Sequence, residues 1–217
     1  MSKIIVLLGA PGAGKGTQAR LLQERLHLPQ ISTGDILRAL AKLDTPIGHE
    51  IRDTQDAGRL ISDDLVIRVV RERTSRDDCK NGYVLDGFPR TTTQANMLEE
   101  LAVEQGKEIV ALSVDVPFEI IEKRTTGRRS CPVCGEIYNM YYRPPRNDEN
   151  CDLHPGVKLF QRPDDTTAEK IKVRLETYDE ETKPLIDYYE SSRRLHRVDG
   201  TATPEEIYKA IERIIGT

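Results

Sequence analysis

Short apolar runs are the clearest pattern in the chain. Residues 4–8 are all Ile, Val or Leu, and shorter or more mixed runs cover residues 83–85, 109–114 and 195–198. Runs of this length that are rich in branched residues predict strands, and a fully apolar run predicts a strand buried on both faces, as in a parallel sheet. We therefore expect four strands at these positions.

Between the apolar runs, hydrophobic residues recur at the spacing of one helix face. The pattern predicts helices over residues 15–25, 35–43, 48–57, 63–74, 93–105, 117–126 and 166–189, with a last helix after residue 203. Asp63 is a suitable N-cap for one of them, and Thr203, Pro204 and Glu206 mark the start of the last helix with a capping box. Strands that alternate with helices predict an α/β fold with a parallel sheet.

The alternation stops at residues 127–160. This segment has no helical period, and it holds four of the twelve Pro, three of the four Cys and three of the eight Tyr. An unstructured loop of this length is uncommon in a compact domain. We expect a small subdomain there, with its own means of stabilisation.

Composition narrows the class of protein. Hydrophobic residues make up 37% and charged residues 31% of the 217 residues, which is typical of a folded domain and not of a disordered chain. The formal net charge of −4 disfavours a general nucleic-acid coat protein. The chain contains no run of 18 apolar residues, so the sequence predicts no membrane span. The first apolar run leads straight into a glycine-rich segment, which favours a buried strand over a signal peptide. We expect a cytoplasmic protein.

Residues 9–15, Gly-Ala-Pro-Gly-Ala-Gly-Lys, match the phosphate-binding pattern G-x-x-x-x-G-K between the first strand and the first helix. The glycines let successive backbone N–H groups point at phosphate oxygens, and the helix N-terminus adds partial positive charge. Lys15 would reach the β- and γ-phosphates as a point charge. The next residue is Gly16, and a hydroxyl follows only at Thr17, so direct ligation of Mg²⁺ by that hydroxyl stays open.

Two further motifs make this loop more specific. The sequence GAPGAGKGTQA at residues 9–19 is followed by Ser-Thr-Gly-Asp at 32–35 with Arg38, and by Asp-Gly-Phe-Pro-Arg at 86–90 with Gln94. Together these resemble the adenylate kinase family, whose members interconvert ATP plus AMP with two ADP. The resemblance spans essentially the whole chain.

The resemblance implies a fold and a division of the chain. Arg124, Gly127 and Arg128 resemble the start of that family's lid. Arg-Pro-Asp-Asp at residues 162–165 resembles its end, and Arg174 the arginine on the following helix. The implied fold is that of the P-loop nucleoside monophosphate kinases, a single α/β domain with a five-stranded parallel sheet flanked by helices. Its parts would be a core of residues 1–31, 62–126 and 161–217, an NMP-binding helical insertion of residues 32–61, and a lid of residues 127–160.

Two nucleotide sites follow from the same resemblance. The ATP site would consist of Gly12, Ala13, Gly14, Lys15, Gly16, Thr17, Arg124, Arg128, Ile137 and Tyr138. The AMP site would consist of Thr33, Arg38, Arg59, Leu60, Ile61, Gly87, Phe88, Pro89, Arg90, Gln94, Arg162 and Arg174. The expected catalytic residues are Lys15, Arg90, Arg124, Arg128, Arg162 and Arg174, and Mg²⁺ would accompany ATP.

Physical chemistry favours arginines in these roles. Phosphoryl transfer depends mainly on positioning and on neutralising charge, so no nucleophilic side chain or general base is required. A guanidinium binds two phosphate oxygens at once, and we expect Arg38 and Arg90 to hold the phosphate of AMP in this way. Asp35 and Asp86 would order the water around Mg²⁺. Their alternatives are an N-cap for Asp35 and a turn for Asp86.

The choice of base depends on two residues. Gln94 offers one donor and one acceptor, which complements the N1/N6 edge of adenine. Thr33 in the Ser-Thr-Gly-Asp motif resembles the adenylate-specific form of the family. A pyrimidine monophosphate kinase is the near alternative, and the long segment 127–160 argues against it, because those relatives usually have a short lid.

The cysteines of residues 127–160 form a metal-binding pattern. Cys131-Pro-Val-Cys134 and Cys151-Asp-Leu-His154 are separated by sixteen residues, and C-x₂-C…C-x₂-H is typical zinc spacing. The resemblance agrees, since some family members carry a four-ligand zinc lid, with cysteine or aspartate more usual at the last position. Four protein ligands leave no open position, so we predict one structural Zn²⁺. The alternative for His154 is an exposed loop histidine.

A different class of function would be a P-loop protein whose zinc ribbon binds RNA or a protein partner. Aromatic and basic residues surround the cysteines, namely Tyr138, Tyr141, Tyr142, Arg143 and Arg146. Acidic residues are interleaved with them, which weakens an electrostatic footprint for RNA. We therefore expect a monomer that binds ATP, AMP and ADP, with no nucleic-acid or membrane partner. Cys79 has no partner in sequence and is expected to be a surface thiol.

Overall fold

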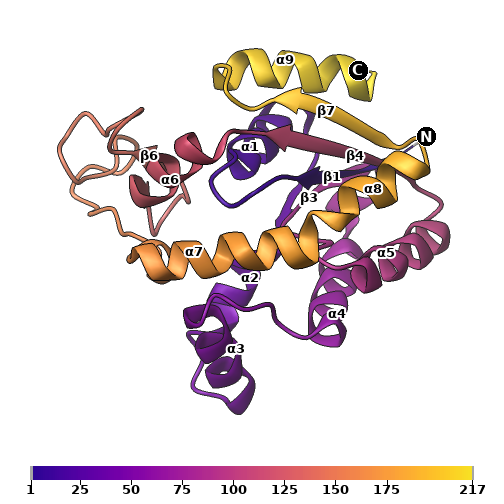
Figure 1. The fold of residues 1–217 in the computed structure, drawn as a ribbon, viewed down its shortest axis with the longest axis horizontal. Helices are drawn as coiled ribbons and strands as arrows, with labels where there is room; N and C mark the ends of the chain where they lie inside the picture. Colours follow the sequence, from indigo (N-terminus) through magenta and orange to yellow (C-terminus); the bar gives the residue numbers. More distant parts are fainter. Residues whose placement is uncertain (1, 217) are drawn as a thin grey trace.

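A parallel five-stranded sheet forms the centre of the molecule (Figure 1), in a computed structural model that describes residues 2–216. Its strands, in the spatial order β2-β3-β1-β4-β7, are β1 (Lys3–Leu8), β2 (Gln30–Ser32), β3 (Gly82–Asp86), β4 (Glu108–Asp115) and β7 (Leu195–Asp199). The four strands predicted from the apolar runs and the α/β fold class are confirmed. The residue pattern misses β2, because a strand of only 3 residues gives no recognisable period.

Helices connect the strands and lie on both faces of the sheet. They are α1 (Lys15–Leu26), α2 (Thr33–Leu40), α3 (Pro46–Asp56), α4 (Asp63–Thr74), α5 (Thr92–Gln105), α6 (Phe118–Thr126), α7 (Ala168–Thr177), α8 (Pro184–Ser191) and α9 (Pro204–Ile215). Short turns of helix are η1 (Asp77–Cys79), η2 (Pro163–Asp165) and η3 (Tyr178–Thr182). The single helix predicted over residues 166–189 is therefore two helices, joined by the π-helical turn η3.

The helix starts agree with the predicted caps in one case and differ in another. Thr203 caps α9 with both hydrogen bonds of a capping box, as predicted. Asp63 is the first residue of α4 and not its N-cap, which is Ser62. Its carboxylate instead accepts a hydrogen bond from Gln94 Nε2 at 2.7 Å. The Asp63 side chain therefore makes a tertiary hydrogen bond instead of the local helix cap that the sequence predicts.

The core has two layers because β1 is buried on both faces. Ile5 and Leu7 pack with residues of α1 and α9, whereas Ile4, Val6 and Leu8 pack with residues of α4, α5 and α8. Alternation of side chains along a strand produces this division. All five strands run parallel, so the loops that follow them meet at one edge of the sheet, where ligands bind in open α/β folds.

Residues 127–160, hereafter the lid, project from this edge (Figure 1). They contain a short antiparallel hairpin of β5 (Arg128–Ser130) and β6 (Ile137–Asn139). The buried apolar cluster of the lid consists of Cys131, Tyr138, Cys151 and Leu159, with Val157 packed partly buried against it. Several large apolar or aromatic side chains of the lid stay in contact with solvent, namely Val133, Met140, Tyr141, Tyr142, Leu153 and Phe160. So small a core calls for another source of stability.

The fourth cysteine of the chain, Cys79, lies outside the lid. Cys79 is completely buried in the core layer beneath α4 and α5, so its prediction as a surface thiol is wrong. The residues next to Cys79 in the sequence are polar, so the sequence does not indicate that η1 turns this side chain inward.

Within residues 2–216, no helix combines the length and apolar character that crossing a membrane requires.

Candidate functional site

The loop between β1 and α1 forms a glycine-lined cradle at the start of α1. Gly12 and Gly14 have positive φ angles of 86° and 102°. A Cβ on Gly12 would lie 2.6 Å from Thr125 Oγ1, so only glycine fits there. Lys15 Nζ donates to the carbonyl oxygens of Gly9 and Ala10, at 2.6 and 3.0 Å. The ammonium group thus folds back over the loop that it follows.

Asp86 brings a carboxylate to this loop from the end of β3. A Cβ on Gly16 would lie 3.2 Å from Asp86 Oδ2, so the carboxylate lies against the first turn of α1. Gln30 Nε2 donates to the same oxygen at 3.5 Å, a long hydrogen bond. The oxygen therefore keeps most of its capacity to accept, which suits the water shell of a Mg²⁺ ion beside phosphates.

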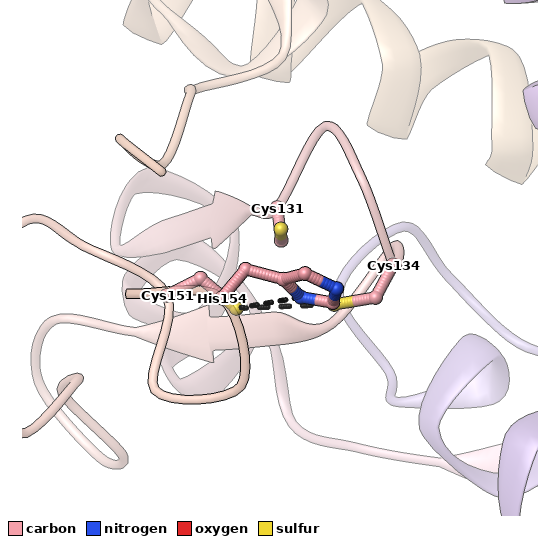
Figure 2. A group of neighbouring side chains, drawn as sticks. All are labelled: Cys131, Cys134, Cys151 and His154. Atoms are coloured by element: carbon pink, nitrogen blue, oxygen red, sulfur yellow. Dashed lines mark hydrogen bonds between the residues drawn. The ribbon is translucent and has the colours of Figure 1, made fainter. Parts of the chain in front are cut away.

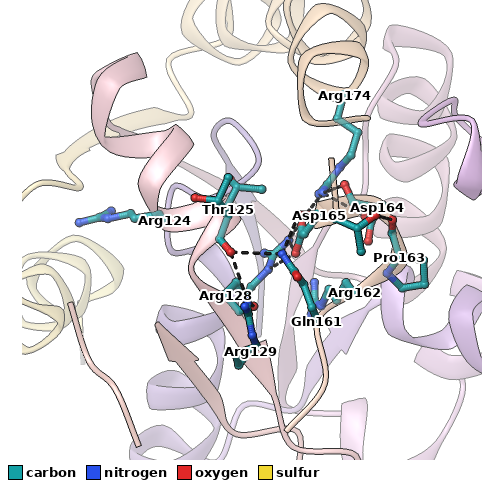
Figure 3. A network of polar contacts seen from close by, with 12 residues as sticks. Arg124, Thr125, Arg128, Arg129, Gln161, Arg162, Pro163, Asp164, Asp165 and Arg174 are labelled. Atoms are coloured by element: carbon teal, nitrogen blue, oxygen red, sulfur yellow. Dashed lines mark hydrogen bonds and ion pairs between the residues drawn. The ribbon is translucent and has the colours of Figure 1, made fainter. Parts of the chain in front are cut away.

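A buried aspartate holds two of the predicted arginines together (Figure 3). Arg128 donates from Nε and Nη2 to the two oxygens of Asp165, both at 2.7 Å. Arg174 Nη1 donates to Asp165 as well and lies 3.0 Å from Asp164 Oδ2. The Asp165 side chain is fully buried, so it fixes both guanidinium groups rigidly.

Two other arginines are only partly paired. Arg162 reaches Asp35 Oδ1 at 3.6 Å, an ion pair too long for a hydrogen bond, while Arg38 donates to the same oxygen. Arg90 Nε donates to the Gly87 carbonyl at 2.9 Å, and its two terminal nitrogens have no hydrogen-bond partner within the described residues. Arg90 and Arg162 therefore keep N–H donors that could bind an anion.

The pKa values of Lys15 and of the neighbouring arginines also indicate an anion-binding site. Burial and neighbouring arginines lower the pKa of Lys15 to about 8, of Arg90 to about 10 and of Arg162 to about 9. Such shifts mean that positive charge is crowded and poorly hydrated. The cations Lys15, Arg38, Arg90, Arg128, Arg162 and Arg174 face the carboxylates of Asp35, Asp86, Asp164 and Asp165. The site therefore has a surplus of positive charge, which suits a polyanion.

A second cluster lies in the lid, where Cys131, Cys134, Cys151 and His154 converge (Figure 2). Their ligand atoms all lie within 4.8 Å of one another. Cys151 Sγ is 3.8 Å from both Cys134 Sγ and His154 Nδ1. Sulfur ligands about 2.3 Å from a tetrahedral zinc ion would be separated by roughly 3.8 Å. The geometry therefore fits a four-coordinate Zn²⁺, with Nδ1 as the histidine ligand.

Comparison with known sequences identifies the family. The sequence profile of the family described as adenylate kinase matches residues 7–194. A protein named adenylate kinase from Clostridium perfringens is 48% identical over 214 residues, which cover 98% of each chain. Another with this name, from Thermodesulfovibrio yellowstonii, is 48% identical over 212 residues, or 97% of this chain and 98% of the relative. The chain belongs to the adenylate kinase family.

Membership makes the chain a nucleoside monophosphate kinase with the fold expected from its motifs. The structure brings most of the predicted catalytic cations together, but it places Arg124 elsewhere. Arg124 Nη1 donates to the Gly200 and Ala13 carbonyls at 2.9 and 3.3 Å, and Figure 3 shows the side chain directed away from Arg128. Arg124 therefore belongs to the outer side of the P-loop and not to the arginine cluster.

Several adenylate kinase positions predicted for AMP are already engaged. Gln94 is buried; its Nε2 donates to Asp63, and its Oε1 accepts from the Arg90 backbone N–H at 2.8 Å. Thr33 Oγ1 donates to the Gly87 carbonyl at 2.8 Å. Both side chains thus order the loop after β3 in this conformation. Contacts of these side chains with adenine would have to use the second Nε2 hydrogen and the lone pairs that these partners leave free.

Burial also limits which parts of the predicted AMP residues can bind. Phe88 and Ile61 are 0% and 8% exposed and pack in the core, so their side chains cannot touch a nucleotide. Pro89 is buried and Leu60 half-buried, whereas Arg59 is exposed after α3. At Phe88 and Ile61, only backbone groups remain available, a distinction that motif resemblance alone does not make.

Tyr138 differs from its prediction as an ATP-site side chain. Its ring is 2% exposed and lies in the lid core. Its hydroxyl accepts a hydrogen bond from the Asp152 backbone N–H at 2.9 Å and lies 3.6 Å from Cys151 Sγ. Since the N–H uses an oxygen lone pair, the hydroxyl proton is free to point at the sulfur. The Tyr138 side chain therefore supports the candidate metal centre.

The prediction from sequence missed the roles of three acidic groups. Asp164 and Asp165 anchor arginines, and the charge of Arg174 and Arg38 keeps the pKa of Asp164 below its usual value despite opposing burial. Ser32, not Asp35, is the N-cap of α2, so the capping alternative for Asp35 is wrong; its carboxylate pairs with arginines. The only signal in the sequence was the two adjacent carboxylates after Arg162.

Proposed function

We propose that the chain transfers the γ-phosphoryl group of Mg-ATP to AMP, reversibly, and yields two ADP. The observation that carries this proposal is the surplus of buried cations at the carboxyl edge of the sheet, with unpaired donors on Arg90. Mixing Mg-ATP and AMP with the protein should give two ADP per turnover in ³¹P spectra. Release of inorganic phosphate with AMP unchanged would contradict it.

Each part of the cradle has a distinct role in this reaction. Lys15 would leave the carbonyls of Gly9 and Ala10 and donate to the β- and γ-phosphates, while the loop N–H groups hold the other oxygens. Arg128 and Arg174, fixed by Asp165, would stabilise charge on the transferred group. Because transfer depends on this charge stabilisation, the chain needs no proton-transfer residue.

The remaining predicted groups flank this centre. Arg38 and Arg90 would bind the phosphate of AMP, and Arg162, which has only a long contact with Asp35, would bridge the two nucleotides. Arg124 would contact ATP at the outer side of the P-loop. When bound, Mg²⁺ would neutralise negative charge on the phosphates, and Asp86 would hold its water shell beside Gly16.

The lid cluster would hold a structural Zn²⁺. Four protein ligands fill a tetrahedral shell, so no position is left for substrate. The lid buries few large side chains, and the metal would supply the missing stability because its ligands come together only in the folded lid. Tyr138 would orient Cys151.

Replacing Arg90 should weaken the binding of AMP but not that of ATP. In Arg90→Ala, we expect the KM for AMP to rise about tenfold to a hundredfold, since a hydrogen bond to a charged group contributes roughly 1.5–3 kcal/mol. The KM for Mg-ATP should change little, because Arg90 lies on the β3 side of the site. Steady-state kinetics with each nucleotide varied in turn give both values. An equal rise of the KM values for both nucleotides would contradict the assignment of Arg90 to the AMP site.

Nucleotide binding should take up a proton above pH 8. Free Lys15 has a pKa of about 8, and phosphates raise it because they favour the charged ammonium. At pH 8.5 roughly three-quarters of a proton should therefore enter the complex, and affinity should fall as the pH rises further. Calorimetry in two buffers of different ionisation enthalpy measures this uptake.

The matched variant for this measurement is Lys15→Arg, which stays charged at all these pH values. We expect a much smaller proton uptake in this variant, because only Arg162, whose pKa is lowered to about 9, still titrates near this pH. Uptake of the same size in both proteins would show that another group titrates.

A further inference from the structure

We infer that Arg20 and Glu136 form a positioning contact that holds the lid down on the P-loop helix. Arg20 lies on α1, which begins at Lys15, and its Nη1 donates to Glu136 Oε2 in the lid. The inference deepens the proposed function, because it concerns the lid over the proposed ATP site.

Glu136 is unusually placed for a lid residue. Its side chain is 10% exposed, although most of the neighbouring residues are open to solvent. Its second oxygen accepts from Arg143 Nη1 at 2.7 Å, so the carboxylate lies between two guanidinium groups. Arg143 in turn lies over the Tyr138 ring, 5.5 Å from its centroid. Glu136 is therefore fixed within the lid by Arg143 and free to present its other oxygen to the core.

The position of the contact distinguishes it from the other polar links of the lid. Within residues 2–216, the remaining side-chain hydrogen bonds and ion pairs between the lid and the rest of the chain reach residues 124, 126 and 165, beside the two ends of the lid. Contacts at a hinge persist when a lid swings. The pair of Arg20 and Glu136 lies away from both ends, so opening of the lid must break it.

The same contact sets where β6 lies. Ile137 follows Glu136 directly, and a Cβ on Gly16 would lie 3.6 Å from Ile137 Cδ1. Holding Glu136 against Arg20 therefore keeps the first residue of β6 over the P-loop. Arg20 itself is 22% exposed and does not reach the cradle, so it acts through Glu136. The pair should favour the closed lid and so lower the KM for ATP.

The test measures lid position without nucleotide. Dyes would be placed on exposed Arg146 of the lid and exposed Val103 of α5, through unnatural amino acids so that the cysteines stay free. In Arg20→Met, we expect the closed-to-open ratio from single-molecule energy transfer to fall about threefold to tenfold, the range for a partly exposed charged pair. Glu136→Gln should behave alike, and the double variant should add little.

Kinetics and a matched control complete the design. Arg20→Met should raise the KM for ATP by the factor by which the closed fraction falls, and leave the KM for AMP and the thermal midpoint unchanged. Arg25→Met removes an ion pair from the same helix, to Glu205 of α9 at 2.7 Å, and should leave lid position and both KM values unchanged.

Three results would overturn the inference. These are an unchanged lid distribution in Arg20→Met, additive effects in the double variant, or an equal effect of Arg25→Met. A lower thermal midpoint with an unchanged distribution would likewise mean a purely structural pair. Since the lid is observed without nucleotide, such a failure leaves the ATP site untouched, whereas absence of ADP formation by the unmodified protein would contradict the proposed function instead.

Discussion

Lys15→Met should lower kcat for ADP formation about a thousandfold, the scale for loss of one group that stabilises transition-state charge in phosphoryl or acyl transfer. The ammonium is the only cation that the P-loop helix itself brings to the cradle mouth, where it now binds two loop carbonyls. Methionine keeps an unbranched side chain, shorter by one atom, and removes the charge. A coupled assay for ADP, at saturating concentrations of both nucleotides, measures the effect.

The fold should survive this substitution, because Lys15 is half-buried at the surface of the cradle and not part of the core. Equal thermal midpoints for the variant and the unmodified protein would confirm this. Lys209→Met on α9, whose side chain is 63% exposed, is the matched control and should keep full activity. A folded Lys15→Met protein with near-normal turnover would exclude Lys15 from the mechanism.

Cys151→Ser should release the metal and unfold the lid. Cys151 is completely buried at the centre of the lid core and contacts two other members of the cluster, so no other residue can replace it. We expect the zinc content to fall from about one ion per chain to near zero, because structural zinc supplies the folding free energy of small domains. Hydrogen exchange of residues 127–160 should become fast, while weak phosphoryl transfer persists at low temperature.

Cys79→Ser is the control, since Cys79 is equally buried but far from the cluster in the core layer under α4 and α5. It should retain the metal. His154→Cys should also retain it, because thiolate and imidazole both suit zinc. Absence of zinc from the unmodified protein, purified without chelator, would contradict the structural site. Loss of all activity on chelation with an ordered lid would mean a catalytic metal.

Local patterns allowed much of the site to be predicted from sequence. The P-loop follows β1 and opens α1, and its function depends on backbone conformation that neighbouring glycines determine. Cys131 and Cys134 are likewise close in sequence, and only one return of the chain was needed to bring Cys151 and His154 beside them. Such constellations leave a recognisable spacing.

Groups whose role depends on distant partners could not be predicted in this way. Asp165 acts by accepting from Arg128 and Arg174, 37 and 9 residues away. Tyr138 is predicted from its motif position to belong to the ATP site, yet its hydroxyl accepts a hydrogen bond from the Asp152 backbone N–H in the lid interior. Gln94 was matched to adenine by its donor and acceptor, and both have protein partners here. Only the packed structure shows which side of such residues is free.

The most direct test of the central proposal is the choice of phosphoryl acceptor. The unmodified protein, with Mg-ATP as donor, would be assayed with AMP, CMP, UMP and GMP in turn. We predict a kcat/KM for AMP at least about tenfold above each of the others, because one good contact with a base edge contributes roughly 1–3 kcal/mol of discrimination. Equal or better use of CMP or UMP would contradict the proposal and favour a pyrimidine monophosphate kinase.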